Sequence, residues 1–572
     1  MNAHLSPEEI VRREALTKLK NHGIDPFPAA EFKTTHTSQD CLHQYEEGKE
    51  VTLAGRIMNQ RVMGKATFAD LQDAVGKIQL YLNVDEICPG DDKSLYNDVV
   101  KHWVHYGDFI GITGKLFTTK MGEISIKVQQ FQLLAKSIKP LPVVKKDADG
   151  NVFDAFTDPE ARYRMRYVDL VVNPQVKQTF ILRTHIINAM RDFFNNHGYL
   201  EVDTPVLQNI PGGAAARPFI THHNSLDIPM YLRIANELYL KRLIVGGFEG
   251  VYEFSRNFRN EGMDRTHNPE FTVMEIYVAF KDYNWMMDFT ENMLNHVCQK
   301  ALGTSEVQHG NNILNFTPPF KRVTMTQAII DYTGFNITGK SEKELHDFCL
   351  SIGLEVNENM GKGKLIDTIF GEKCEKNYIQ PTFITDYPVE MSPLCKRHRN
   401  NPELTERFEL MINGKEIANA YSELNDPIDQ LGRFEEQMRL MERGDDEAMF
   451  IDHDFIRSLE YGMPPTSGMG IGVDRLVMLL TNNETIQEVL LFPQMRPEKH
   501  QHGPDLGAFR DLGVSEEWLE HLPKAGFHSI EELQQAKPTA IHQQLNGYRK
   551  KNKLEIPAIQ LEDILAWISQ IN

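Results

Sequence analysis

The sequence predicts an α+β multidomain protein: a small N-terminal β-barrel, a large domain of strands and helices, and a small all-α unit at the C-terminus. The chain has 572 residues, more than one hydrophobic core usually supports. Apolar residues alternate with strand periodicity in 51–134, mix strand and helix periods in 176–498, and keep helical spacing alone after residue 504. Three folded parts are therefore expected.

Residues 1–49 are expected to form a helical segment. Pro7 opens the stretch 7–22, acidic residues fill its first turn, and apolar residues follow at helical spacing until Gly23. Residues 50–138 are expected to form the barrel, because short Gly-bounded strands of this kind suit a small closed sheet. The expected strands are 51–58, 65–73, 77–83, 108–117 and 123–134.

Residues 139–175 are expected to be a linker, because the Pro- and Lys-bearing stretch 136–158 follows neither period. The large domain takes residues 176–500 and the helical extension residues 504–572. Two glycine turns in the extension, at Gly513 and Gly526, resemble helix-hairpin-helix modules, in which turn amides can meet a phosphate.

Charge and cysteine content restrict the class of protein. A net charge of -19 disfavours nucleic acid on average. Basic residues nevertheless cluster in 12–20, 136–146 and 549–553, where they either meet phosphates or form solvated faces. The six cysteines form no CxxC pair, so reduced thiols are expected rather than zinc. Without a signal peptide or membrane-length apolar run, we expect a cytoplasmic protein that contacts no membrane.

The first chemical motif is FSRNFRNEG, Phe254 to Gly262, which lies between a strand and a charged loop. At a strand end, the planar fork of Arg259 is well placed to grip a phosphate, and Glu261 points the same way on an extended backbone. A surface salt bridge explains this motif equally well.

The second motif is the glycine alternation at Gly468, Gly470 and Gly472, which precedes Asp474 and Arg475. A Rossmann loop needs its third glycine after two intervening residues, so we reject that reading and predict a tightly packed extended segment. Arg475 falls in the first turn of a helix, where the dipole disfavours cations. Either a bound polyphosphate or the neighbouring Asp474 would relieve this conflict.

The third motif is a hairpin with the turn Asn413-Gly414. A two-residue loop places Met411 opposite Glu416, and Glu409 therefore shares a sheet face with Glu416. On a buried face these carboxylates would repel each other unless a cation intervened, and Mg²⁺ with ATP phosphates would meet that need. On an exposed face the pair would carry no function.

Further along the same strand, Asn419, Tyr421 and Glu423 alternate, but a regular strand would point them away from the paired carboxylates. We predict a β-bulge near Ile417 or Ala418, which would bring all of them to one face.

Together these segments resemble the signature motifs of class II aminoacyl-tRNA synthetases. His197 to Gln208 (HGYLEVDTPVLQ) is similar to motif 1, Phe258 to Glu261 (FRNE) to motif 2, and Gly468 to Arg475 (GMGIGVDR) to motif 3. Over residues 5–498 the chain resembles bacterial lysyl-tRNA synthetases, in which an OB-fold barrel that reads the anticodon precedes the catalytic domain.

The resemblance implies that the chain activates L-lysine with ATP to lysyl-adenylate and transfers lysine to tRNA(Lys). It implies a homodimer joined through motif 1, and up to three Mg²⁺ ions that accompany ATP. A sister synthetase for aspartate or asparagine, or a regulatory paralogue without activity, remains an alternative. Lysine is favoured because its ammonium needs negative partners in a dry pocket.

The resemblance also implies roles for individual residues. Those implied to bind ATP are Arg259, Glu261, His267, Phe271, Glu409 and Arg475, of which the two arginines are catalytic. The implied metal ligands are Glu409 and Glu416. Those implied to bind lysine are Gly213, Glu237, Glu275, Tyr277, Asn419, Tyr421, Glu423 and Gly470. Those implied to read the anticodon are Phe68, Gln79 and Gln130, the last standing where the family often has Glu. As single residues, Phe68 and Phe271 fit a hydrophobic core better than a stacking site.

Overall fold

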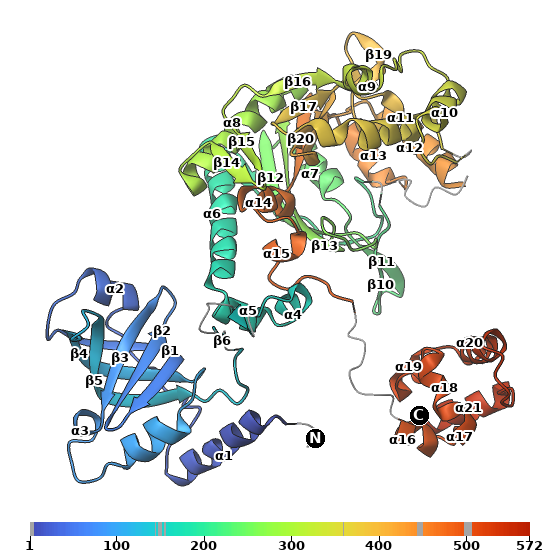
Figure 1. The fold of residues 1–572 in the computed structure, drawn as a ribbon. Coiled ribbons are helices and arrows are strands. Elements are labelled where there is room, and N and C mark those ends of the chain that lie inside the picture. The colour runs from blue at the N-terminus through green and yellow to red at the C-terminus, as the bar shows by residue number, and fades with distance from the viewer. Residues whose placement is uncertain are drawn as a thin grey trace. The chain divides into compact units, whose positions relative to one another are not determined.

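The computed structural model describes residues 5–142, 145–146, 152–153, 156–214, 216–357, 360–442, 450–496 and 506–571. The expected boundary between residues 500 and 504, and part of the expected linker, lie outside these ranges. The chain divides into two compact units, Met1–Pro493 and Gln494–Asn572, each described by itself (Figure 1). Among the described residues, no helix has the length and apolar run that crossing a bilayer requires.

Helix α1 (Pro7–Asn21) begins where the sequence predicts. The Ser6 side chain accepts a hydrogen bond from the Glu9 amide, and the Glu9 carboxylate accepts one from the Ser6 amide. This reciprocal cap satisfies two amides that the first turn leaves free. The short helix α2 (Ser38–His43) follows before the barrel.

The predicted five-stranded barrel is confirmed, and it closes in the order β1-β2-β3-β5-β4. Its inward side chains, among them Leu53, Leu80 and Ile112, form one apolar core. Helix α3 (Val84–Ile87) and the π-helix η1 (Leu95–Trp103) connect β3 to β4. The strands are β1 (Glu50–Met63), β2 (Ala66–Gln72), β3 (Lys77–Asn83), β4 (Phe109–Thr118) and β5 (Ile124–Ala135).

The range 139–175 is not the irregular linker that the sequence predicted. Besides the short strands β6 (Lys145–Lys146) and β7 (Val152–Phe153), it contains helices α4 (Pro159–Arg164) and α5 (Arg166–Val172). Arg162 Nη2 lies 3.0 Å from Glu488 Oε2, and the buried Arg166 donates from Nη2 to the Gln487 carbonyl at 2.7 Å. These long-range contacts, which local periodicity cannot reveal, attach both helices to the large domain.

The large domain is built on a sheet with eight strands among the described residues, in the order β16-β17-β20-β21-β22-β13-β12-β8. Neighbouring strands from β17 to β12 are antiparallel, and the outermost pair at each end is parallel. In that order the strands are Lys321–Thr324, Thr382–Thr385, Arg407–Ile412, Lys415–Ser422, Thr466–Gly472, Glu270–Ala279, Gly250–Phe258 and Leu200–Glu201.

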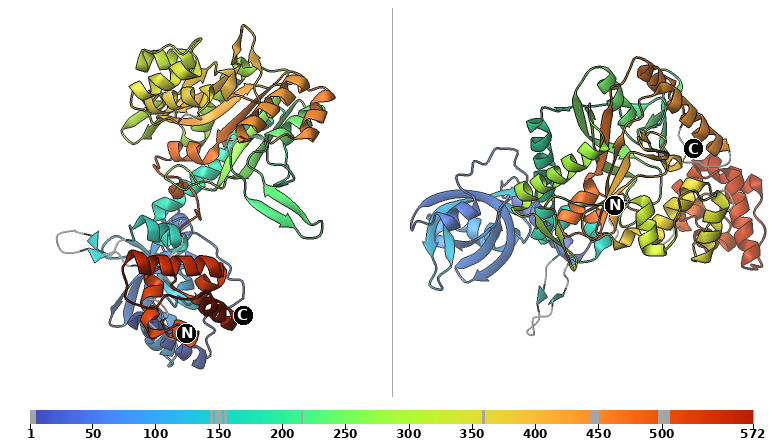
Figure 2. Two further views of the ribbon diagram at one scale, coloured as in Figure 1. Left: turned by 90° about the vertical axis from the view of Figure 1, so that its right-hand side faces the viewer. Right: turned by 90° about the horizontal axis from the view of Figure 1, so that it is seen from above.

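Alternate residues of the central strands face opposite sides of this sheet. One side, with Met274, Leu410 and Ile471, packs under helices α6 (Pro174–Asn196) and α8 (Tyr283–Leu302) in the main hydrophobic core (Figure 2). The other side carries polar side chains and glycines. Because the pleat alternates, one apolar face holds the sheet while the other is free for chemistry.

The other elements of this unit connect or flank the sheet. The strands are β9 (Leu207–Gln208), β10 (Ile220–His223), β11 (Ile228–Leu232), β14 (Glu306–His309), β15 (Asn312–Asn315), β18 (Arg397–His398) and β19 (Asn401–Thr405). The helices are α7 (Glu237–Val245), α9 (Met325–Thr333), α10 (Glu342–Ser351), α11 (Lys362–Lys373), α12 (Pro427–Glu442), α13 (His453–Glu460), α14 (Val473–Leu480) and α15 (Ile486–Val489), with 3-10 turns η2 (Glu375–Asn377) and η3 (Val389–Met391).

The predicted hairpin and bulge are both confirmed. Asn413 and Gly414 have positive φ angles of 53° and 68°, as a tight two-residue turn requires. Met411 pairs with Glu416, whereas Leu410 pairs with Ala418, so Ile417 is the extra residue of the bulge. The bulge restores the strand's later odd-numbered residues to the face of Glu409.

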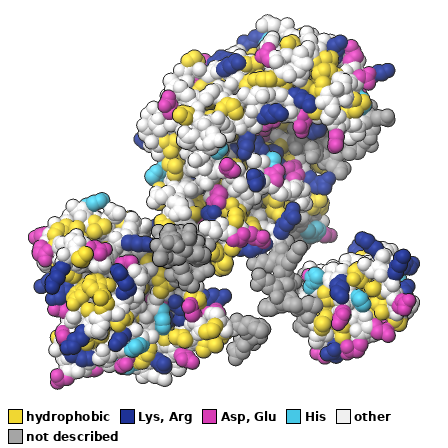
Figure 3. Space-filling model, viewed as in Figure 1, with side chains coloured by type: hydrophobic (Ala, Val, Ile, Leu, Met, Phe, Trp, Pro, Cys, Tyr) yellow, Lys and Arg dark blue, Asp and Glu magenta, His cyan; other side chains and the backbone are white. Residues whose placement is uncertain are grey.

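The C-terminal unit is all-α, with its own core around the buried Trp518. The predicted turns at Gly513 and Gly526 have positive φ angles of 81° and 102°. Lys and Arg side chains gather at one end of this unit (Figure 3), where α20 closes with 549–551. Its helices are α16 (Leu506–Asp511), α17 (Glu516–Leu519), α18 (His521–Lys524), α19 (Ile530–Gln535), α20 (Pro538–Lys551) and α21 (Leu561–Ile571).

Candidate active site

The polar side of the large sheet, called here the site face, is organised around glycines on its central strand β22. Gly470 pairs with Glu275 on one side and with Asn419 on the other, and Asn419 in turn pairs with Glu409. In the next row, Gly468 lies between Tyr277 and Tyr421 in the same way. Because glycine has no side chain, the flanking polar residues border an open strip along β22.

The alternating glycines do not have equal space. A Cβ on Gly468 would lie 2.1 Å from Glu423 Oε1 and 2.4 Å from a ring carbon of Tyr277, whereas one on Gly470 would come no closer than 3.7 Å, to Glu275 Cγ. Tight packing, the predicted reason for the alternation, therefore applies at Gly468. Gly470 instead leaves room above the sheet.

At one end of the strip lies a carboxylate pocket, defined by Glu237, Glu275, Tyr277, Tyr421 and Glu423. The Tyr421 hydroxyl donates to Glu237 Oε1 at 2.7 Å, and the Tyr277 hydroxyl donates to Glu275 Oε2 at 3.0 Å. Burial and the nearby Glu237 raise the pKa of Glu275 to about 8. All three carboxylates are buried, so a cationic group is favoured there.

The loop before β10 closes onto this pocket at Gly213. Its φ angle is 87°, and a Cβ there would lie 3.1 Å from the Cβ atoms of both Ala235 and Glu237. Gly213 thus permits a close approach of backbone to the carboxylate pocket.

One protein cation already lies in the pocket. The side chain of Lys241 is fully buried, and its Nζ lies 2.5 Å from Glu237 Oε1 and 2.5 Å from Glu423 Oε2. Burial alone would lower the pKa of Lys241, but the two carboxylates overcome this and raise it. Lys241 is therefore a permanent ammonium ion between two of the three acids.

The other end of the site face brings three predicted residues together. Arg475 Nη2 lies 3.0 Å from His267 Nε2, and its Nη1 donates to the Glu416 carbonyl at 3.1 Å and lies 3.7 Å from Glu416 Oε2. On the side shown in Figure 3, Lys, Arg, Asp and Glu side chains gather around a hollow in the first unit. A cluster of cationic and neutral donors around a hollow suits a polyanion.

Asp474 is not a free counter-charge for Arg475. Its Oδ2 accepts a hydrogen bond from the Thr272 amide at 2.7 Å, and its Oδ1 lies 2.7 Å from Arg183 Nη1. Asp474 thus joins helix α14 to β13 and α6. Arg475 lies in the first turn of α14, where the helix dipole disfavours its positive charge. A bound phosphate would offset this unfavourable interaction.

Arg259 follows the last residue of β12, as predicted, and its guanidinium carbon lies 5.2 Å from the ring centre of Phe271. Its Nε is buried without a hydrogen-bond partner among the described residues. Phe271 is half-buried on β13 and belongs to none of the described hydrophobic cores, and Glu261 is exposed. An aromatic face and an unpartnered donor therefore lie side by side.

Glu409 and Glu416 share the site face, as the hairpin register predicted. Arg407 Nη2 lies 2.5 Å from Glu409 Oε1, while burial and the neighbouring Glu416 raise the pKa of Glu409 to about 7. This mutual destabilisation is what a divalent cation would relieve, so the pair fits Mg²⁺. In the described part of the chain, no group of three acidic, His or Cys side chains is arranged to hold a metal ion. An ion there would complete its coordination with phosphate and water oxygens.

In the barrel, Phe68 is half-buried on the outer surface rather than in the core. It pairs with Tyr81 at a ring distance of 5.2 Å, and Tyr81 lies 5.8 Å from Phe117. Beside this aromatic cluster, Gln79 donates to Glu123 Oε2 at 2.8 Å and accepts from Ser125 Oγ at 2.9 Å. Rings and amide groups of this kind suit unstacked bases.

Gln130 does not lie with Gln79. Ser125 is the direct neighbour of Gln79 across the β3–β5 pairing, whereas Gln130 lies five residues further along β5, roughly 16 Å away at the usual rise of a strand. The acidic residue beside Gln79 is Glu123. The register therefore separates Gln130 from Gln79, and the anticodon role of Gln130 stays a prediction.

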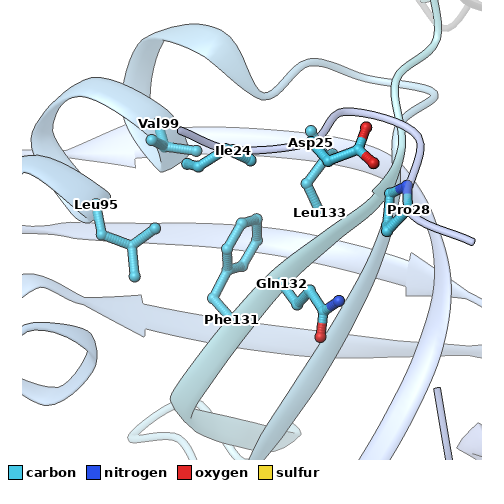
Figure 4. A pocket seen from close by; sticks show the side chains of 8 residues that line it. All are labelled: Ile24, Asp25, Pro28, Leu95, Val99, Phe131, Gln132 and Leu133. Carbon is cyan, nitrogen blue, oxygen red and sulfur yellow. The ribbon is translucent and has the colours of Figure 1, made fainter. Parts of the chain in front are cut away.

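A separate cavity of about 220 Å³ lies beside the barrel, between the chain after α1, η1 and β5 (Figure 4). Phe131 projects between Leu95 and Ile24, and Asp25 is the one titratable residue of the lining. A mostly apolar lining lacks the convergent charges that a nucleotide or an amino acid needs.

Sequence reasoning missed Lys241, Arg407 and Glu123. Lys241 follows Glu237 by four residues on one helix, a spacing that pairs side chains, but burial decides that the pair belongs to the site. Arg407 precedes Glu409 by two residues on one strand, so strand periodicity could have found it. Glu123 lies between a glycine turn and the first residue of β5, and only the register places it beside Gln79.

Comparisons with known proteins agree with this geometry. A family model described as "tRNA synthetases class II (D, K and N)" matches residues 158–496, and one described as "OB-fold nucleic acid binding domain" matches residues 51–134. A lysine–tRNA ligase of Porphyromonas gingivalis W83 is 64% identical over 568 residues, covering 98% of both chains. One from Christiangramia forsetii is 66% identical over 495 residues, covering 86% of this chain and 87% of its own.

The chain belongs to the class II aminoacyl-tRNA synthetases of the aspartate, lysine and asparagine group. Its extensive identity to several lysine–tRNA ligases places it in that family: it is a bacterial-type lysine–tRNA ligase, which acts on ATP, lysine and tRNA(Lys). The family uses Mg²⁺-ATP. The aspartate, asparagine and regulatory alternatives are thereby excluded.

One relative matches a smaller share of this chain. A lysine–tRNA ligase of Azobacteroides pseudotrichonymphae is 62% identical over 498 residues, which is 99% of its own chain but 86% of this one. Part of this chain therefore has no counterpart in that ligase.

Proposed function

We propose that the site face binds lysine in the carboxylate pocket and ATP at the Arg475 end, so that the lysine carboxylate attacks the α-phosphorus between them. The observation that carries this is the glycine strip of β22, bordered at one end by three buried carboxylates and at the other by Arg475 and His267. No protein nucleophile is needed, because positioning and charge neutralisation supply the catalysis.

The ATP site is proposed from the cationic and aromatic groups. Adenine would stack on the ring of Phe271. Arg259 lies beside that ring and has an unpartnered Nε, so we assign it to the α-phosphate. His267 and Arg475 hold the outer phosphates, and Glu261 contacts the adenine amino group. Removing one such donor to a developing charge typically costs about 3 kcal/mol of transition-state stabilisation.

The metal site is proposed at Glu409 and Glu416. Mg²⁺ bound with ATP, in up to three ions, would neutralise phosphate charge and favour departure of pyrophosphate. Arg407 would hold Glu409 in place through its 2.5 Å contact, and Asn419, whose Nδ2 donates to Glu409 Oε1 at 3.4 Å, would connect the metal pair to the lysine site.

In the lysine site, Glu237, Glu275 and Glu423 would receive the two ammonium groups of the substrate, and Tyr277 and Tyr421 would enclose its alkyl chain. Gly213 and Gly470 would admit the substrate closely, because neither carries a side chain.

This site predicts that lysine binding releases a proton from Glu275. With a pKa of about 8, the free carboxyl is protonated at pH 7. A bound ammonium favours the ionised form and lowers that pKa, so about one proton leaves at pH 7 and lysine affinity rises as the pH rises through 8. Calorimetry of lysine binding in two buffers of different ionisation enthalpy measures the release.

The Glu275→Gln variant is the control, because its side chain cannot titrate and its proton release should fall close to zero. A wild-type enzyme that releases no proton between pH 6.5 and 7.5 would argue against the place of Glu275 in the lysine site.

For tRNA, we propose that Phe68 stacks on an anticodon base while Gln79 and Glu123 read base edges. Phe68→Ala should raise the KM for tRNA(Lys) by roughly 5- to 100-fold, since one stack contributes about 1 to 3 kcal/mol. Lysine-dependent ATP–pyrophosphate exchange, which needs no tRNA, should stay unchanged. Aminoacylation assays over a range of tRNA concentrations check both.

Phe27→Ala, which removes an exposed ring outside the aromatic cluster, serves as the matched control and should leave both activities intact. Equal tRNA kinetics for the Phe68 and Phe27 variants would sink the anticodon assignment.

We also propose a homodimer joined through residues 197–208. Support comes from exposed apolar side chains in and beside this segment, among them Leu200 and Leu207, which are 48% and 47% exposed. Several exposed apolar side chains in one short segment favour a protein partner. Leu207→Arg should weaken the dimer about tenfold or more, because it buries an unpaired charge.

Sedimentation velocity over a dilution series checks the dimer. Ile428→Arg, at an apolar position on α12 that is 83% exposed, should sediment as wild type. A monomeric wild-type protein at micromolar concentration would rule the dimer out.

The domain assignment follows the same logic. We assign residues 1–49 to the helical segment, 50–138 to the OB-fold, 176–500 with the preceding helices α4 and α5 to the catalytic domain, and 504–572 to the extension. We place the enzyme in the cytoplasm, where tRNA is charged for translation, and its six cysteines, all described, buried and unpaired, suit a reducing compartment.

A further inference from the structure

The buried ammonium of Lys241 lies where the proposed lysine site would receive an ammonium group of the substrate, so its role in that site needs an explanation. A pocket built to receive an ammonium group already holds one, at 2.5 Å from both Glu237 and Glu423. The Lys241 side chain is 0% exposed, and its Nζ lies 5.5 Å and 5.8 Å from the ring centres of Tyr421 and Phe455. Enclosed in this way, it cannot leave when substrate enters.

The net charge of the carboxylate pocket explains the presence of Lys241. Once bound lysine has ionised the carboxyls of the pocket, Glu237, Glu275 and Glu423 bring three negative charges, and Lys241 cancels one of them. Two net negative charges remain, and they equal the two ammonium groups of substrate lysine. In a site that excludes water, one unbalanced charge is costly. The net charge of the occupied pocket therefore affects lysine binding as much as the individual contacts with lysine do.

Geometry supports the same role. Glu423 turns Oε2 toward Lys241, while its Oε1 is buried without a hydrogen-bond partner among the described residues and faces the space above Gly468. Burial raises the pKa of Glu423, and the ammonium of Lys241 opposes that rise. Lys241 thus fixes one oxygen of Glu423 and leaves the other directed at strand β22, over Gly468.

We infer that Lys241 is a positioning residue for substrate lysine, which bridges Glu237 and Glu423 and sets the net charge of the carboxylate pocket to match the two substrate ammonium groups. This inference rests on the proposed lysine site. A purely structural ion pair would stabilise the fold without setting the affinity for lysine.

The test is a double-mutant cycle with Lys241→Met and Glu237→Gln, read out as the KM for lysine and the KM for ATP in pyrophosphate exchange. Each single change shifts the pocket by one charge in opposite directions, and each should raise the KM for lysine at least tenfold with the KM for ATP changed less than threefold. The double variant has the same net charge in the pocket as the wild type, and it should have a lower KM for lysine than the worse single variant.

A double variant with a KM for lysine at or above that of the worse single variant would overturn the inference, because the changes would then act independently. If Lys241→Met alone does not fold, the comparison of Glu237→Gln with the double variant remains decisive. The double variant must then have the lower KM for lysine.

Lys136→Met is the matched control. Lys136 forms an equally buried pair with Asp108 at 2.6 Å, but in the barrel. It should lower the thermal unfolding temperature as a broken buried pair does, and leave the KM for lysine unchanged. Failure of the lysine site itself would look different, since Glu237→Gln and Glu423→Gln would then leave the KM for lysine unchanged.

Discussion

Arg475→Ala is expected to reduce ATP–pyrophosphate exchange by about 10² to 10³-fold while leaving the fold intact, because it removes a donor from phosphates that gain charge in the transition state. Arg259→Ala should have a comparable effect. The Arg475 side chain is partly exposed and hydrogen-bonds to His267 and to the Glu416 carbonyl, so its loss should open no cavity in the core. The measurement is steady-state exchange at saturating lysine, with circular dichroism to monitor the fold.

Arg256→Ala is the matched control for both arginines. Arg256 lies on the same strand that leads to Arg259, but it is exposed and lies 3.7 Å from Glu270, too far for more than a weak ion pair. It should retain exchange within about twofold of wild type. If the exchange rate of Arg475→Ala also stayed within threefold of wild type, the proposed role of Arg475 in binding the ATP phosphates would be wrong.

Gly468→Ala is expected to raise the KM for lysine at least tenfold and to lower the thermal unfolding temperature. The added Cβ would lie 2.1 Å from Glu423 Oε1 and 2.4 Å from the Tyr277 ring, closer than atoms approach in proteins. Both neighbours are buried, so one of them must move out of the proposed lysine site, at a cost of about 1 to 3 kcal/mol.

Gly470→Ala separates packing from substrate binding. The nearest atom to its added Cβ is 3.7 Å away, an ordinary contact, so the unfolding temperature should match that of wild type. The new methyl group would still narrow the proposed lysine site, and the KM for substrates should rise. Two variants with the same unfolding temperature would contradict the difference in space between these glycines.

Local sequence patterns predicted much of the site because hairpins and alternation are local properties. The Asn413-Gly414 turn sets the register that pairs Met411 with Glu416. Glu416 and Asn419 are an odd number of residues apart, so an extra residue, found at Ile417, is needed to bring both to one face of the sheet. Pairing between distant segments could not be predicted in this way: the register of β3 with β5 places Glu123 beside Gln79 and Gln130 roughly 16 Å from Ser125, the direct neighbour of Gln79.

By itself, the sequence determined the order of the folded parts and the enzyme class, since each follows from short-range periodicity or from motifs contiguous in the chain. Only the tertiary structure decided that α4 and α5 belong with the catalytic domain, that Glu123 lies beside Gln79, and that Lys241 lies between two acids. The physical reason is the same in each case. Burial and pairing between distant segments decide which charges meet, and a sequence pattern records a residue's neighbours along the chain but not across space.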